Sequence, residues 1–436
     1  MTSDEIASLI PALACLPARF RPFFPREKVF SYLQKYVVGL LSDMKRKSIE
    51  PMALAADVPV RTFQEFLSFF DWDGQRVSEE LVRQVAEEND MEHAIGVFDA
   101  SAHVKQGTKT PGVQRQWCGE VGKKENCVIG HHLLYTDNHP TNPFSCVLTS
   151  DLYLPKSWAE DRRRCRAAGI PDDLEYRPGW RILIDQLARV IANRVRLEYV
   201  TFDEEFGSVV ELWFELDRLG QRAIGEVKPN FYGWVTLPKY QSGRSEYAPH
   251  RVDDLVAHSP AFYGQPWQTV TIKNTTRGPA VWQIKYAPMY LPIRQDHHVP
   301  VPTDRTYWLI AARQPDTGEV KYFVSNAPLS TPVLELLRVA FSRWHVEKWF
   351  ERAKQEAGLG AFEVRIYQSL MRHWLICRIA MFFLARETRR LRKKKSADHA
   401  GAGSGGGKYI DGAIVESLLA NVEVHGGACG VLAMAK

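Results

Sequence analysis

The stretch "LEYVTFDEEFGSVVELWFELDRLGQRAIGEV", Leu197–Val227, decides the fold class. Its first part is an apolar run that ends at Asp203 and predicts a β-strand. The next part, "SVVELWFELDRLG", has apolar residues at helical spacing and a closing Gly220, and "RAIGEV" predicts a second strand. A strand, a helix and a strand in this order form a β-α-β unit, which is typical of a mixed α/β sheet.

The segments before this unit predict further strands of the same sheet. "AIGVFDAS" is an apolar run that is predicted to end at Asp99, while "NCVIGHHLLYTD" and "FSCVLTSDLYLP" predict two more strands. "GWRILIDQLARVIANR" then predicts an amphipathic helix. The order indicates an antiparallel start that passes into β-α-β units.

Composition divides the rest of the chain into further parts. Residues 1–90 predict short helices joined by tight turns, and their cations favour a helix-turn-helix-like DNA-binding unit over a helical packing domain. Residues 91–230 and 329–395 predict the α/β core and its C-terminal helices. Residues 231–328, rich in Pro, Gly, Tyr and Trp, predict an all-β insertion between them. Residues 396–436 include "AGAGSGGG" and predict a flexible linker and tail.

Bulk properties exclude several classes of protein. The chain has 436 residues, of which 45% are hydrophobic and 25% charged, as in a globular protein of two or three domains. A net charge of +5 permits a nucleic-acid partner without requiring one. Seven cysteines without a CxxC pair indicate reduced thiols, and no apolar run is long enough to span a membrane. With no basic leader before an apolar stretch, the sequence predicts a cytoplasmic location.

The stretch "RWHVEKWFERAK", Arg343–Lys354, predicts a helix that carries one acid between two cations on one face. At about 100° per residue, Arg343, Glu347 and Lys354 fall within an arc of roughly 40°. The simplest interpretation is an ion pair between Arg343 and Glu347 at i,i+4, worth about 0.3–0.5 kcal/mol. The alternative is a functional face, with Glu347 as a ligand and the two cations as phosphate contacts.

The functional interpretation gains weight from two other carboxylates. Asp99 and Asp203 both follow apolar strands, so a mixed sheet can present them together beside Glu347 on a late helix. Carboxylate oxygens are the ligands that Mg²⁺ and Mn²⁺ prefer, and two such ions can drive phosphodiester cleavage. Taken singly, each Asp is equally consistent with an ordinary turn residue at a strand end.

Other candidate residues favour structural roles, with one exception. His131 and His132 are adjacent on a predicted strand, so they point to opposite faces and do not form one metal site; His297 and His298 are likewise not expected to bind metal. Trp282 and Trp308 in the insertion favour core packing over base stacking. The exception is the basic run Arg386–Lys395, which favours phosphate contact over a solvated face.

These residues also carry a resemblance to a known family. The chain resembles DDE-type insertion-sequence transposases of the cut-and-paste kind, which have a β-rich insertion before the catalytic Glu, and within them the group catalogued as seven-oh-one. The pattern RxxxExxxxxxK, met by Arg343, Glu347 and Lys354, is similar to the late motif of that superfamily. Ala340 stands where the motif usually has a tyrosine.

Further segments extend the resemblance over roughly residues 20–390. "RQWCGEVGKKENC" and "LYLPKSWAEDRRRCRAAGIPDD" resemble the family's stretches after the first Asp, and "DEEFG" its second acidic segment. The first acidic segment departs more, since "DASAHVKQG" keeps only Asp99, Lys105 and Gly107 of the usual pattern.

The resemblance implies a fold, a reaction and partners. It implies a ribonuclease-H-like core, Mg²⁺ replaceable by Mn²⁺, and double-stranded DNA as element ends and target, held by a homodimer. The implied catalytic and metal-binding residues are Asp99, Asp203 and Glu347; the implied phosphate contacts are Arg343, Lys354 and Lys105. Two alternatives stay open, a catalytically inactive transposase-derived DNA-binding protein and a metal-dependent nuclease without strand transfer.

Overall fold

A computed structural model of the chain describes residues 9–89, 91–140, 142–238, 248–275, 278–293 and 300–398. The predicted linker and tail lie outside the described residues from 399 onward, as do His297 and His298. Residues 396–398, predicted to begin the linker, instead end the last helix, which reaches Asp398. No helix in the described ranges has the length and apolarity needed to cross a membrane.

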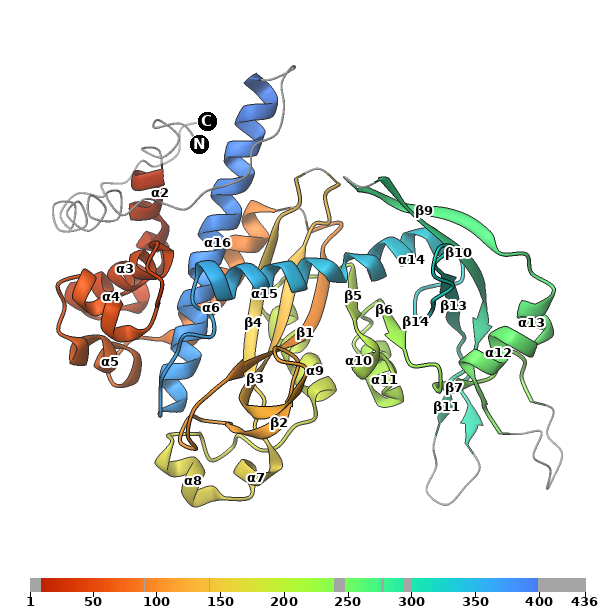
Figure 1. Cartoon of the computed structure of the whole chain (residues 1–436), viewed down its shortest axis with the longest axis horizontal. Coiled ribbons are helices and arrows are strands. Elements are labelled where there is room, and N and C mark those ends of the chain that lie inside the picture. Colours follow the sequence, from red (N-terminus) through yellow and green to blue (C-terminus); the bar gives the residue numbers. More distant parts are fainter. Residues whose placement is uncertain are drawn as a thin grey trace.

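One large mixed sheet forms the centre of the molecule, so the predicted α/β class is confirmed (Figure 1). Its order is β2-β3-β1-β5-β6-β14-β13-β10-β9, with β4 paired to β3. β1, β5 and β6 run parallel and their neighbours antiparallel, as the β-α-β unit predicts. The strands are β1 (Ile95–Val104), β2 (Gln114–Cys118), β3 (Lys123–Thr136), β4 (Ser145–Leu152), β5 (Tyr199–Phe202), β6 (Ala223–Val227), β9 (Gln268–Thr275), β10 (Gly278–Met289), β13 (Tyr307–Arg313) and β14 (Val320–Ser325).

Asp99 lies in the middle of its strand, and the prediction that it ends the strand is wrong. β1 continues for five residues to Val104 because each of them pairs with β3, from Ala100 opposite His131 to Val104 opposite Cys127. The residues after Asp99 are small and polar, which does not predict a strand. They are a strand whose alternate side chains are covered by helices.

Helices cover both faces of the sheet near β1. His131 faces α9 (Gly179–Ala192), since an added Cβ on Gly179 would lie 2.8 Å from its ring. The neighbouring His132 faces the other way and packs against Phe350 of α15 (Trp344–Glu356). The prediction that the two histidines point to opposite faces is confirmed. The remaining core helices are α7 (Lys156–Ala159), α8 (Arg162–Ala167), α10 (Glu204–Gly207), α11 (Val210–Arg218), α14 (Val333–Ala340) and α16 (Tyr367–Asp398), with the 3-10 turn η3 (Phe341–Arg343) between α14 and α15.

The stretch predicted as an all-β insertion contains helices as well. Its strands β9, β10, β13 and β14 continue the central sheet, because β14 pairs antiparallel with β6. Two helices, α12 (Val252–His258) and α13 (Pro260–Tyr263), interrupt it, so the all-β description is wrong. Short strands make two further pairs, β7 (Tyr232–Gly233) with β8 (His250–Arg251) and β11 (Pro292–Ile293) with β12 (Val301–Pro302).

The N-terminal part is helical, as predicted, and it shares its core with α16. Two arginines of α16 make the connection. Arg372 donates to the backbone carbonyls of Phe66, Leu67, Phe70 and Trp72, and Arg378 donates to Val147 and Leu148 on the outer edge of β4. The N-terminal helices are α2 (Leu9–Cys15), the 3-10 helix η1 (Leu16–Phe23), α3 (Glu27–Leu41), α4 (Ile49–Ala55), α5 (Val60–Ser68) and α6 (Gly74–Glu88).

Candidate active site

The predicted helix around Glu347 is present and has one buried and one open side. Trp349 and Phe350 of α15 are buried, whereas the Glu347 side chain is 57% exposed. Arg343 Nη2 lies 2.9 Å from Glu347 Oε1, so the ion pair at i,i+4 exists. Taken alone, this pair is worth little stability.

Arg343 also reaches the sheet, which an ordinary ion pair on a helix does not require. Its Nη1 lies 3.4 Å from Oδ2 of Asp99, whose side chain is only 16% exposed. One guanidinium therefore lies between a carboxylate of β1 and a carboxylate of α15. This contact brings together Asp99, Glu347 and Arg343, three of the six residues that the sequence predicts for the site.

Asp203 stands where β5 meets α10, directly after the strand, as predicted. Its Oδ1 accepts from the backbone N–H groups of Glu205 and Phe206 at 3.1 and 3.3 Å, which caps α10. β5 pairs with β1 through Val97 and Thr201, so Asp203 and Asp99 follow neighbouring parallel strand segments. The turn-forming role of Asp203 and a role in the site are therefore compatible.

Asp99 and Asp203 are close enough for their negative charges to repel each other. Burial first, and then the charge of Asp203, raise the pKa of Asp99 to about 7, against the opposing effect of Arg343; Glu347 adds a smaller upward contribution. Burial also raises the pKa of Asp203, and Arg343 opposes that shift. A cation bound between these side chains would stabilise their ionised forms, because its charge offsets the cost of burial and their mutual repulsion.

The chemistry of these donors fits a hard divalent cation, although the observed geometry is not a closed ligand set. No three histidine, cysteine, aspartate or glutamate side chains of the described ranges are gathered closely enough to hold a metal. Around Asp99 and Glu347 the reason is visible, because the Arg343 guanidinium lies between them. Carboxylate oxygens are the ligands that Mg²⁺ and Mn²⁺ prefer, and Asp99, Asp203 and Glu347 all supply such oxygens.

Lys354 and Lys105 lie near this face but use their ammonium groups within the protein. Lys354 Nζ donates to the carbonyl of Ala102 on β1 at 3.2 Å and lies 3.7 Å from Glu120 Oε1. Lys105 donates to the carbonyls of Gly360 and Phe362 at 2.7 and 2.8 Å, and burial lowers its pKa to about 8. Phosphate contact by either lysine stays a prediction.

The two tryptophans pack against other side chains, and two arginines of the basic run form ion pairs. Trp308 is buried and donates to the carbonyl of Pro328, while Trp282 packs on Phe341, so the predicted packing role is confirmed. In the basic run, Arg386 and Arg389 form ion pairs with Glu88 and Asp137. These pairs occupy two of the cations that were predicted to contact phosphate.

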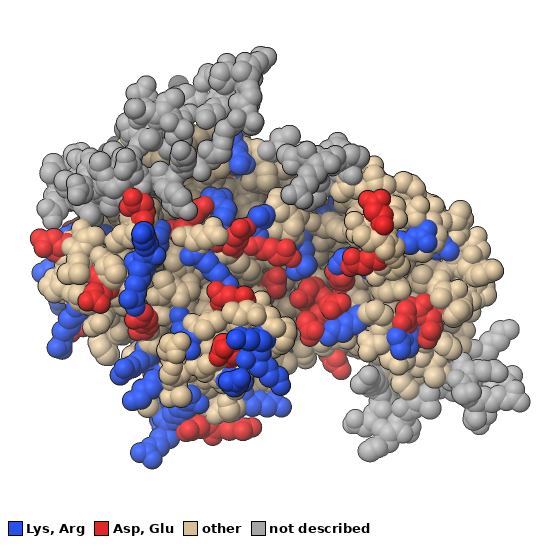
Figure 2. All heavy atoms as spheres, viewed as in Figure 1, with Lys and Arg blue, Asp and Glu red and all other residues tan. Residues whose placement is uncertain are grey.

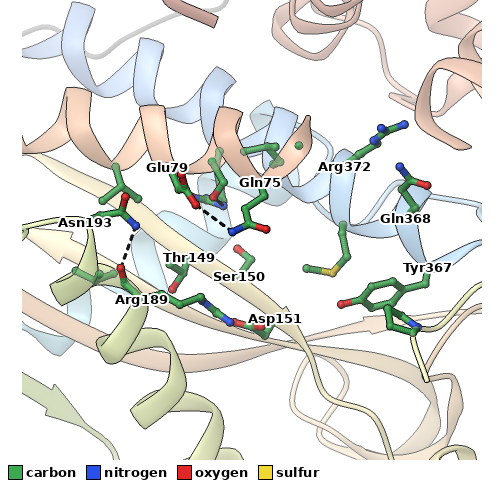
Figure 3. Close-up of a pocket in the computed structure, with 18 of the residues that line it drawn as sticks. Gln75, Glu79, Thr149, Ser150, Asp151, Arg189, Asn193, Tyr367, Gln368 and Arg372 are labelled. Carbon is green, nitrogen blue, oxygen red and sulfur yellow. Dashed lines mark hydrogen bonds and ion pairs between the residues drawn. The ribbon is translucent and has the colours of Figure 1, made fainter. Parts of the chain in front are cut away.

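A cavity of about 740 Å³ lies apart from the acidic residues, between α6, β4, α9 and α16 (Figure 3). None of the six predicted site residues lines it. Asp151 at its floor is paired with Arg189 and, at 3.8 Å, with Arg177. The cavity is therefore a seam between the helical part and the sheet, and the acidic cluster is the better candidate for chemistry.

Comparison with known proteins identifies the class. Residues 19–279 match the family described as DDE superfamily endonuclease, which is more than half of the chain. The chain belongs to that family. Asp99 and Asp203 lie inside the matched range, whereas Glu347 and Arg343 lie beyond it.

Individual relatives are more distant. A probable transposase for insertion sequence element IS701 from Microchaete diplosiphon is 28% identical over 114 residues, which is 25% of this chain and 29% of that protein. A solved piggyBac transposase synaptic complex with hairpin DNA covers 93% of this chain and 74% of its own, with 10% identity and a TM-score of 0.41. That score does not transfer residue roles from one chain to the other.

Proposed function

We propose that this chain is a DNA transposase that cuts phosphodiester bonds at the ends of its element and joins the 3′-hydroxyls to target DNA. The observation that supports this best is the convergence of Asp99 and Glu347 on Arg343, with Asp203 close enough to raise the pKa of Asp99. Family membership supports the nuclease part, and the IS701 relative supports transposition.

In this proposal the three carboxylates hold divalent metal, Mg²⁺ or Mn²⁺. The metal would supply an activated water or 3′-hydroxyl and stabilise the leaving oxygen. Asp99 comes from the centre of β1 and Asp203 from the capped start of α10, so both are fixed by backbone structure. Arg343 has two donor nitrogens directed into the site, and a guanidinium can bind a phosphate in bidentate fashion.

The rest of the chain receives roles that follow from this reaction. The core would be ribonuclease-H-like, the helices of residues 1–90 would bind the terminal repeats, and residues 231–328 would be the insertion before the catalytic Glu. Two DNA ends must be held together, which calls for a homodimer acting on DNA in the cytoplasm. An inactive transposase-derived DNA-binding protein is the second candidate, because Arg343 pairs with two of the acids.

Incubation of the full-length protein with end-labelled DNA from the flanks of its own gene tests the proposal. Specific nicks that depend on Mg²⁺ or Mn²⁺, followed by joined products with added target DNA, are expected. Binding without nicks would favour the inactive alternative. Nicks without joining would leave a nuclease of the same family.

Replacing Arg343 separates a catalytic role from a structural one. We expect Arg343→Lys to lower the rate of strand cleavage by about 10²-fold, because a lysine keeps the charge but not the two-pronged geometry. Its free energy of unfolding should change by less than about 1 kcal/mol, since a lysine keeps a positive charge beside Asp99 and the ion pair with Glu347 is exposed. Arg352→Lys is the matched control, because Arg352 also pairs at i,i+4 with Glu356 on the same helix. Equal rates of strand cleavage by the two variants would show that Arg343 has no catalytic role beyond its ion pairs.

A further inference from the structure

The hairpin formed by β2 and β3, residues 114–127, exposes an aromatic side chain that packing does not explain. Trp117 is 61% exposed, and Val121 at the turn is also open to solvent. A tryptophan normally buries most of its large surface. In Figure 1 the hairpin lies below α15, away from the helical N-terminal part.

The pairing register places Trp117 on the same sheet face as Asp99. Asp99 is opposite His132 in the pairing of β1 with β3, and Trp117 is opposite Lys124 in the pairing of β2 with β3. Residues directly opposite share a face, and along β3 every second residue shares a face. His132 and Lys124 are an even number of residues apart, and neither of these two pairings contains a bulge. The face that carries Asp99 therefore continues into the hairpin.

The hairpin turn is tied back to the helix that carries Glu347. Lys354 of α15 lies 3.7 Å from Glu120 in the turn while it donates to the carbonyl of Ala102. Ala102 is three residues from Asp99 on β1, which is about 10 Å of strand. A DNA strand that leaves Asp99 would thus meet the hairpin within about five nucleotides, at about 3.4 Å each.

Two cations that form no ion pair in the described chain flank the exposed ring. Arg115 stands two residues before Trp117 on the same face, and Lys124 stands opposite Trp117. Among the described residues, neither side chain takes part in a hydrogen bond or an ion pair, whereas Lys123 lies 3.7 Å from Glu125. Figure 2 shows Lys and Arg gathered on the lower part of the molecule, where Figure 1 places α7, α8 and this hairpin.

We propose that this hairpin is a DNA-binding arm of the acidic site, in which Trp117 stacks on an unpaired base and Arg115 and Lys124 contact the adjoining phosphates. An aromatic platform between cations is the arrangement that binds single strands with little sequence preference. Glu120 and Lys354 act as positioning residues, because their contact sets the place of the arm. The inference rests on the proposed function, since it supposes DNA at Asp99.

Fluorescence anisotropy with labelled oligonucleotides tests the stacking role without relying on cleavage. With full-length protein and no added metal, Trp117→Ala should weaken binding of a single strand about tenfold, and Trp117→Phe should restore most of it. Binding of the matching duplex should change much less. Tyr263→Ala is the matched control, because Tyr263 is 78% exposed on α13, outside the hairpin. A Trp117→Ala variant that binds the single strand as wild type does, or a wild type that binds neither DNA, would overturn the proposal.

If Glu120 positions the hairpin, replacing it should change DNA affinity in the direction opposite to the effect of charge alone. Glu120→Gln removes a negative charge from a DNA-binding surface, which by itself should tighten binding. If the contact with Lys354 places the arm, the same variant should instead weaken single-strand binding, and Trp117→Ala should then cost less in that background. Tighter DNA binding by Glu120→Gln would show that the contact between Glu120 and Lys354 does not position the hairpin.

The outcomes also separate this inference from the nuclease proposal. Binding that depends on Trp117 in a protein that never cuts DNA would contradict the nuclease and leave the arm in place. Metal-dependent cutting by a protein whose DNA binding does not depend on Trp117 would support the nuclease and contradict the DNA-binding arm.

Discussion

Asp99→Asn, Asp203→Asn and Glu347→Gln should each lower DNA cleavage by about 10³-fold or more, equivalent to about 4 kcal/mol of activation free energy. Each amide keeps the shape of its carboxylate but removes the charge that would hold divalent metal. The measurement is cleavage of labelled element ends in Mg²⁺ and in Mn²⁺, with DNA binding followed in parallel. Glu351→Gln is the control, since Glu351 stands one turn after Glu347 and pairs only with Lys348 in the described chain. A variant that cuts at the wild-type rate would remove that residue from the site.

Asp99→Asn should not lose stability, and this distinguishes a functional site from a structural ion pair. The pKa of Asp99 is raised by burial and by the charge of Asp203, so its ionised form is disfavoured in the folded protein. A raised pKa means that stability falls as the pH rises from about 4 towards about 7, where the buried group ionises. At pH 8 we therefore expect Asp99→Asn to unfold at an equal or higher urea concentration than wild type.

Gly207→Ala should destabilise the protein by about 3 kcal/mol or more and abolish cleavage with it. A Cβ on Gly207 would lie 2.0 Å from the carbonyl oxygen of Glu226 on β6. That atom belongs to a strand held on both sides, between β5 and β14, so α10 must move instead. Asp203 caps α10 and would move with it. Urea unfolding and DNA cleavage should both report the change.

Gly264→Ala provides the control for the glycine substitution. The nearest atom to a Cβ there is 3.9 Å away, and its backbone φ of −76° suits any residue. We expect its unfolding midpoint and its cleavage rate to match those of wild type. If Gly207→Ala behaves in the same way, α10 is not held against β6 as closely as described.

The sequence predicted the elements of the site better than their contacts. Apolar periodicity was sufficient for α15, for the strand before Asp203 and for the opposite orientations of His131 and His132. The contact of Arg343 with Asp99 was not predictable, because it depends on how α15 lies across β1. A helical wheel shows only the partner within the helix, Glu347.

The predictions from sequence were wrong where contacts with distant parts of the chain outweigh the preference of the local sequence. The small residues after Asp99 have little strand propensity by themselves, yet they form β1 because β3 supplies hydrogen-bond partners along the whole stretch. Lys47 is one of the cations of residues 1–90 that favour a DNA-binding unit in the sequence, but it is buried and donates to the carbonyls of Leu40 and Glu356. Charge in a sequence does not reveal which side chains become buried.

The dependence of the N-terminal helices and the β4 edge on α16 has a consequence for the nascent chain. Arg372 and Arg378 are synthesised 306 and 231 residues after their partners Phe66 and Val147, which takes roughly 10 to 60 s at about 5–20 residues per second. Until then the carbonyls of α5 and β4 lack these donors, and Glu347 has itself only just been made. A chain that ends before α16 would lack these contacts, and one that ends before Glu347 would also lack one of the three acids. Under the proposed function, DNA cutting therefore requires that α16 has already been made.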